Sequence, residues 1–180
     1  MARPRVPAIA AAALAAAALL RAAAAAAAPA GPAQPIKFSH KVHAGDASIG
    51  CTSCHVYAER GPVAGIPSMA RCQGCHKFVK EDLEKPQINA ELKPLLEILR
   101  SQKPIEWVRV HRVPDHVFFT HARHVRAGVR CQECHGEVQQ MEVVRQVAPL
   151  TMGWCLECHQ RKQREVPGRE RLTECVTCHK

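Results

Sequence analysis

Hydrophobic and polar residues alternate most clearly at helical spacing between Asn89 and Arg100. Leucine and isoleucine recur there every three to four residues, which predicts an amphipathic helix near 89–101. Asn89 is a suitable cap for the start of this helix, and Pro94 falls early, where proline is less damaging. The pattern alone is equally typical of a helix that covers a cofactor edge and of one that binds a partner subunit.

A second hydrophobic pattern lies at the N-terminus, where Arg3 and Arg5 precede an alanine-rich apolar run of 15 residues. Arg21 ends this run, and further alanines continue to Ala28. A positive start, a short apolar stretch and small residues behind it are typical of a secretory signal. We therefore expect residues 1–28 to be a signal peptide cleaved near Ala28 or, alternatively, an N-terminal membrane anchor. Both interpretations place the rest of the chain on the periplasmic side of a bacterial inner membrane.

All ten cysteines fall into five C-x-x-C-H units, in which a histidine always follows the second cysteine directly. This is the attachment motif of c-type haem, whose vinyl groups bond the thiols and whose iron binds the histidine. Zinc sites and disulfides also use paired cysteines, but neither explains this histidine five times over. The thioether cysteines are Cys51 and Cys54, Cys72 and Cys75, Cys131 and Cys134, Cys155 and Cys158, and Cys175 and Cys178; the proximal iron ligands are His55, His76, His135, His159 and His179.

The chain also contains an internal repeat that carries a phenylalanine and two histidines. Its copies are Phe38-x-His40-x-x-His43 and Phe119-x-His121-x-x-His124, each followed by two C-x-x-C-H units. A repeat of this kind indicates a duplicated structural unit. We predict a linker at 29–35, a first dihaem module at 36–80, a haem-free insert at 81–110, a second dihaem module at 111–165 and a C-terminal haem unit at 166–180.

Six histidines remain outside the attachment units, which is enough to give every iron a second ligand. We number the sites 1 to 5 in the order of their C-x-x-C-H units. In each repeat, we assign the first histidine to the next site along the chain and the second histidine to the site after it. The distal ligands expected are His40 for site 1, His43 for site 2, His121 for site 3, His124 for site 4 and His111 for site 5, with His116, Met152, Met141 and Met69 as alternatives for the last.

Composition fits a chain that is built around its cofactors. Only 7 of the 180 residues are aromatic, and five haems would leave roughly 30 residues each, too few for an independent core. We therefore predict a mostly irregular fold with short α-helices, organised around a stack of five haems. Loss of residues 1–28 lowers the net charge from +9 to +6, and ten haem propionates bring it to about −4. Nucleic acid is therefore not an expected partner.

The region from Pro104 to His159 closely resembles the pentahaem cytochrome subunit of bacterial alternative complex III, a quinol oxidase complex, and the similar subunit of the related quinone reductase complex. The resemblance covers residues 36–180 and is most specific over 104–159, although His116 stands where an aromatic residue is expected. It implies a subunit that links an iron–sulfur or molybdopterin-like subunit and integral membrane quinol subunits to a monohaem cytochrome c or an oxidase.

Two closed axial positions on every iron favour an electron carrier over a catalyst, so we predict no catalytic residue. The chain would then transfer electrons in a quinol-oxidising membrane complex, held there by the complex or by its N-terminal anchor, without being an enzyme by itself. Two alternatives are a free periplasmic shuttle of the class III type and a multihaem reductase with one open iron. The reductase would require an iron that lacks a second ligand.

Overall fold

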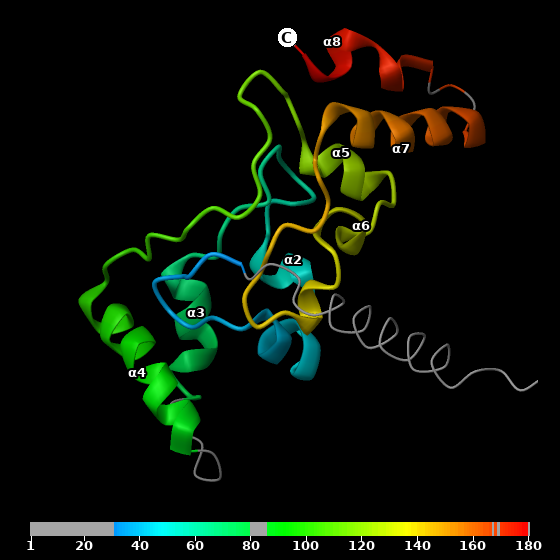
Figure 1. Ribbon diagram of the computed structural model, residues 1–180. Helices are drawn as coiled ribbons and strands as arrows, with labels where there is room; N and C mark the ends of the chain where they lie inside the picture. Colours follow the sequence, from blue (N-terminus) through cyan, green and yellow to red (C-terminus); the bar gives the residue numbers. More distant parts are fainter. Residues whose placement is uncertain (1–30, 80–85, 167, 169, 180) are drawn as a thin grey trace, which may run out of the picture. The chain divides into compact units, whose positions relative to one another are not determined.

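Short helices joined by long irregular segments make up the chain in a computed structural model that describes residues 31–79, 86–166, 168 and 170–179 (Figure 1). Within these residues there is no strand, and an isolated bridge joins Val117 to His179. This confirms the prediction of a mostly helical and irregular chain. The predicted signal or anchor at 1–28 and the start of the insert at 81–85 lie outside the described residues. No helix of the described part is both long and apolar enough to cross a bilayer.

The two cysteines of each C-x-x-C-H unit lie within one helix. Residues three apart share one side of a helix, so the two cysteines of a unit face the same way. The elements in chain order are η1 (Lys41–Asp46), α2 (Cys51–Cys54), α3 (Met69–His76), α4 (Pro86–Ser101), α5 (His121–Arg126), α6 (Cys131–His135), η2 (Val138–Gln140), α7 (Met152–Glu165), η3 (Glu170–Thr173) and α8 (Cys175–Cys178).

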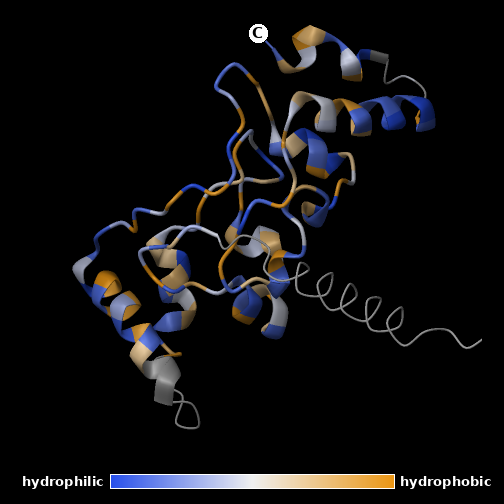
Figure 2. Ribbon diagram, viewed as in Figure 1, coloured by the Kyte–Doolittle hydropathy of each residue, from blue (hydrophilic) through white to orange (hydrophobic). Residues whose placement is uncertain are grey.

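The helix of the insert, α4, begins at Pro86, so Asn89 lies inside it and the prediction that Asn89 caps it is wrong. Its buried residues are Leu95 and Leu99, and α4 contacts α3, where Gln73 donates to the Leu99 carbonyl at 3.5 Å. Figure 2 shows hydrophobic and hydrophilic residues mixed along this helix. None of its large apolar side chains in the range 90–101 is exposed, which favours a covering role over a free docking face.

The polypeptide buries few apolar side chains by itself. In the described part of the chain the buried ones are Ala58, Leu95, Leu99, Ala122 and Ala148, and three of these are alanines. Large apolar residues next to attachment histidines are instead exposed, with Tyr57 at 56% and Phe78 at 77%. Such a distribution fits a fold in which large apolar cofactors complete the core.

Candidate haem-binding sites

The ring of a second histidine lies close to the histidine of every attachment unit. The distances between ring centres, with interplanar angles, are 6.5 Å and 2° for His40–His55, 6.1 Å and 52° for His43–His76, 6.2 Å and 6° for His121–His135, 6.0 Å and 25° for His124–His159, and 5.5 Å and 22° for His116–His179. These are five separate pairs. No three His, Cys, Asp or Glu side chains gather as a metal site among the described residues.

This separation suits one iron between two imidazoles. A bond from a metal to an imidazole nitrogen is about 2 Å long, and that nitrogen lies about 1.1 Å from its ring centre. Two histidines on opposite sides of one iron therefore have ring centres about 6 Å apart. The structure thus brings together the partners expected for sites 1 to 4, with four distances between 6.0 and 6.5 Å.

The structure does not bring His111 to site 5. The ring of His111 lies 4.4 Å from that of His135 at an angle of 83°, and this distance is too short for an iron between them. His116 instead lies beside His179, because the backbone of Phe118 donates to the Cys178 carbonyl at 2.7 Å and fixes this loop against α8. The histidine ring beside His179 in the structure is therefore that of His116, whereas the sequence predicts His111 there.

Backbone carbonyls orient most of these rings through their Nδ1 atoms. The bonds run from His43 to Ser39 at 2.8 Å, from His55 to Gly65 at 2.6 Å, from His76 to Val79 at 3.3 Å, from His121 to Pro62 at 2.8 Å, from His124 to Thr120 at 2.8 Å, from His159 to Leu172 at 2.9 Å and from His179 to His116 at 3.3 Å. A carbonyl only accepts, so Nδ1 carries the proton and Nε2 keeps its lone pair. This arrangement is typical of histidines that bind a metal through Nε2.

The repeated phenylalanine has the same place in both modules. Phe38 stacks on His43 at 4.4 Å and meets His40 edge-on at 4.9 Å. Phe119 stacks on His124 at 4.6 Å and meets His121 edge-on at 4.8 Å (interplanar angle 87°). A single aromatic side chain in each module therefore packs on both candidate distal histidines, and the repeated phenylalanine is the sequence signal for this role.

Burial keeps two of these histidines neutral, as a metal ligand must be. Burial lowers the pKa of His40 to about 4, with smaller effects from His55 and His43. Burial likewise lowers the pKa of His135 to about 4, with smaller effects from neighbouring histidines. Neutral imidazole at pH 7 keeps the Nε2 lone pair available for iron.

The ten cysteines form no disulfide. Burial raises the pKa of five of their thiols, those of Cys54, Cys72, Cys131, Cys134 and Cys155. These thiols remain protonated at neutral pH. The sites therefore offer paired thiols and a neutral histidine, which is the donor set of c-type haem.

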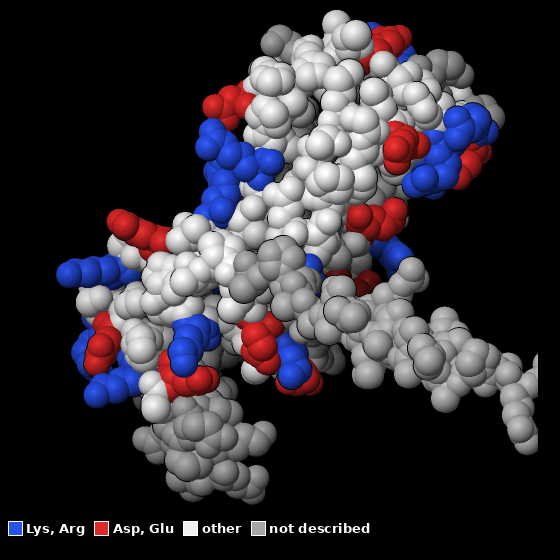
Figure 3. All heavy atoms as spheres, in the orientation of Figure 1, with Lys and Arg blue, Asp and Glu red and all other residues white. Residues whose placement is uncertain are grey.

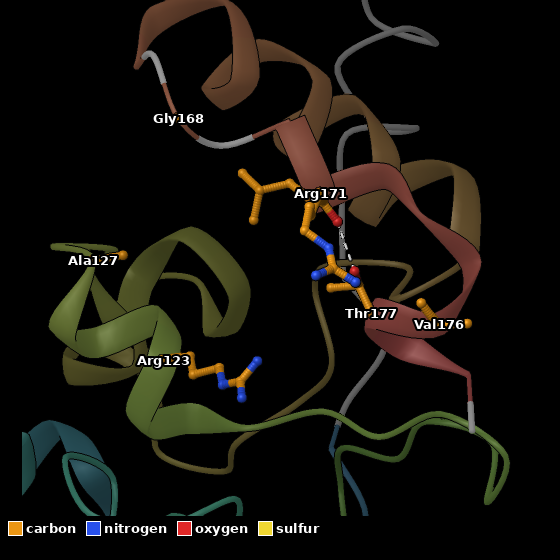
Figure 4. Close-up of a pocket in the computed structure, with 7 residues that line it drawn as sticks. Arg123, Ala127, Gly168, Arg171, Val176 and Thr177 are labelled. Atoms are coloured by element: carbon orange, nitrogen blue, oxygen red, sulfur yellow. Dashed lines mark hydrogen bonds between the residues drawn. The ribbon is translucent and has the colours of Figure 1, made fainter.

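A cavity of about 550 Å³ lies between α5, η3 and α8 (Figure 4). Leu172 lines it, and its carbonyl accepts the Nδ1 proton of His159. Val176, between the cysteines of site 5, also lines it. Arg123 and Arg171 extend toward this cavity, where their guanidinium groups suit carboxylates such as haem propionates.

Most of the charged side chains on the face seen in Figure 3 lie toward its edges. A basic cluster covers the end of α7, where Arg161, Lys162 and Arg164 follow one another closely. Glu165 partly neutralises it through ion pairs of 2.7 Å with Lys162 and 4.0 Å with Arg161. This cluster is a solvent-exposed feature and not part of a ligand pair.

Two family models match different parts of the chain. Residues 117–180 match the family described as cytochrome c7 and related cytochrome c, and residues 17–93 match the class III cytochrome c family. The matched ranges include all five attachment units and both Phe-x-His-x-x-His repeats, and they leave out residues 94–116 with most of the insert, His111 and His116.

The chain is also similar to the multihaem cytochrome c subunit of menaquinone reductase from Nitratidesulfovibrio vulgaris (strain Hildenborough), and the two sequences are 43% identical over 103 residues. The match includes 57% of this chain and 45% of the relative, so the chain spans less than half of the relative's length. Together with the attachment units and their paired histidines, these similarities are those expected of a multihaem c-type cytochrome, a class whose haem c is bound covalently.

Proposed function

We propose that this chain is a pentahaem electron carrier on the periplasmic side of the inner membrane, in a complex that exchanges electrons with quinone. The observation that carries the proposal is the second histidine ring at 5.5 to 6.5 Å from each attachment histidine. Bound there, haem c would supply an iron that changes between the ferric and ferrous states without gaining or losing a ligand.

The residues of the chain would hold each haem in three ways. Two cysteines on one helical turn provide thioether bonds, the histidine of the same unit provides the proximal ligand, and a histidine from another segment provides the distal ligand. The distal ligands we propose are His40, His43, His121, His124 and His116. The methionine candidates Met69, Met141 and Met152 are then not needed at any site, and His111 is not a ligand.

Two histidines on every iron argue against the reductase alternative. Such an enzyme needs an open coordination position for its substrate, and each attachment histidine here has a histidine partner. A closed pair of imidazoles changes little when the iron changes oxidation state, which suits electron transfer. The chain by itself would therefore be a carrier and not an enzyme.

Membership of a quinone-linked complex is supported by the similarity to the menaquinone reductase subunit. We propose integral membrane quinol subunits and an iron–sulfur or molybdopterin-like subunit as partners, with a monohaem cytochrome c or an oxidase as acceptor. We further propose alternative complex III as the complex and residues 1–28 as the signal or anchor that exports the chain. The competing proposal is a free periplasmic shuttle.

Affinity purification of the tagged full chain from native membranes tests this proposal. We expect large integral membrane subunits to copurify, and a menaquinol analogue to reduce haem in the purified complex but not in the isolated chain. Recovery of the chain as a soluble monomer from the periplasmic fraction would contradict the complex and support the free shuttle.

A further inference from the structure

The two dihaem modules contact each other through equivalent hydrogen bonds. The backbone N–H of Lys41 donates to Met141 at 3.0 Å, and that of Ala122 donates to Gly61 at 3.1 Å. Lys41 and Ala122 each follow the first histidine of a repeat, and Met141 and Gly61 each lie ten residues after the first cysteine of a module. Each module therefore makes the same contact on the other.

These two bonds belong to broader contacts. On one side η1 packs against η2, and the backbone of Gly45 lies so close to the Gln139 carbonyl that a Cβ would not fit between them. On the other side both the backbone N–H and the Nδ1 of His121 donate to the Pro62 carbonyl, at 3.1 and 2.8 Å. In both cases, the segment that follows the first attachment unit of one module in the sequence contacts the segment that carries the distal histidines of the other module.

Reciprocal contacts of this kind are those of a two-fold interface, where equivalent parts of the two copies meet near the axis. Cys51 and Cys131 are such equivalents, and so are His55 and His135. After burial, the neighbouring Cys51 thiol is the largest cause that raises the pKa of Cys131. The first attachment units of the two modules therefore face each other.

The remaining neighbours follow from the helices that carry the distal histidines. His40 precedes η1 and His43 lies within it, so sites 1 and 2 are adjacent. His121 and His124 share α5, so sites 3 and 4 are adjacent. Helices α7 and α8, which carry sites 4 and 5, both contact η3.

From these contacts we propose that the attachment sites lie in the spatial order 2–1–3–4–5, with sites 1 and 3 facing each other across the contact between the modules. This order differs from the order in the sequence and rests on the ligand assignments of the proposed function. Sites 2 and 5 are then the ends of the series. Redox partners would approach near α3 and α4 at one end and near α8 at the other.

His40→Met and His43→Met form a matched pair of variants that tests this order, because they place the same substitution on neighbouring positions of one short segment. Methionine raises the potential of the site it joins, so that site can be reduced alone. EPR of the poised holoprotein then shows which ferric signals change when that one iron becomes diamagnetic. We expect two perturbed neighbours in His40→Met, from sites 2 and 3, and one in His43→Met, from site 1.

The reverse result, one neighbour for His40→Met and two for His43→Met, is what the sequence order 1–2–3 gives and would overturn the proposal. If neither variant changes the ligation of any iron, the ligand assignments fail instead. Iron positions from anomalous scattering by holoprotein crystals then decide the order independently. The distances to compare are those from the iron of site 3 to the irons of sites 1 and 2. If the proposal holds, the iron of site 1 is the nearer of the two. If the iron of site 2 is nearer, the proposal is wrong.

Discussion

The four candidate sites of the two modules and the fifth candidate site differ in how the chain places the histidine that we propose as the distal ligand. In the modules a short helical segment carries two histidines, and a phenylalanine packs on both rings. At the fifth site, His116 stands on an irregular loop, is exposed, and lies 5.5 Å from His179. The loop is held by the bridge between Val117 and His179. The comparison shows that a duplicated motif determines four sites locally, whereas the path of the chain determines the fifth.

The strongest test of this comparison is to remove each candidate ligand of the fifth site in turn. We expect His116→Ala to open one iron, because no other histidine ring of the described chain lies beside His179. The measurement is a high-spin ferric EPR signal, together with carbon monoxide binding by roughly one haem in five.

His111→Ala is the matched control, since it removes a histidine from the same segment without removing a proposed ligand. All irons should then remain low-spin. A high-spin signal from His111→Ala and none from His116→Ala would reverse the assignment and restore the expectation drawn from the sequence.

Acid should lower the stability of the folded chain through two buried histidines of the modules. Burial lowers the pKa of His40 and of His135 to about 4 in the folded chain, below the value of about 6.5 in an unfolded chain. The unfolded state therefore binds more protons in this window, so the free energy of unfolding falls as pH drops from about 6.5 to about 4. Thermal unfolding of the chain between pH 7 and pH 4 measures this loss, and a melting temperature that does not change would contradict it.

A glycine supports the proximal ligand of site 1. Gly65 has a φ of +80°, and its carbonyl accepts the Nδ1 proton of His55. An added Cβ would meet the Tyr57 ring at 2.8 Å. We expect Gly65→Ala to lower the free energy of unfolding by about 1–3 kcal/mol and to shift the potential of site 1.

Gly74→Ala is the control for this change, because Gly74 lies in α3 and a Cβ there meets nothing within 4 Å. Alanine in a helix should be neutral or stabilise by about 0.5–1 kcal/mol. Thermal melts of the two variants give the comparison, and equal melting temperatures would rule out the special role of Gly65.

The arginines at the cavity should have the smallest effect. Both Arg123 and Arg171 are exposed at their ends, and Arg171 also pairs with Glu174 at 3.0 Å. We expect Arg123→Gln to lower one haem potential by on the order of tens of millivolts, because it removes a positive charge beside a site. Spectroelectrochemical titration measures this shift, and an increase in potential would contradict it.

For the modules, the sequence indicates which histidines belong together, because the spacing of these residues limits their geometry. Two histidines three residues apart on a helical turn reach neighbouring positions, and the repeat shows which residues belong together. The same reasoning does not decide between His111 and His116, because the choice depends on how the loop between Trp107 and Val117 returns to α8. The contact between the modules was also beyond the sequence, since it joins backbone atoms that have no residue signature.

The central claim is that five covalently bound haems each have two histidine ligands. The most direct measurement is the EPR spectrum of the oxidised full-length holoprotein, together with its haem content per chain. We expect five haems per chain and only low-spin ferric signals. Fewer than five haems, or a high-spin signal that accounts for one haem per chain, would contradict it.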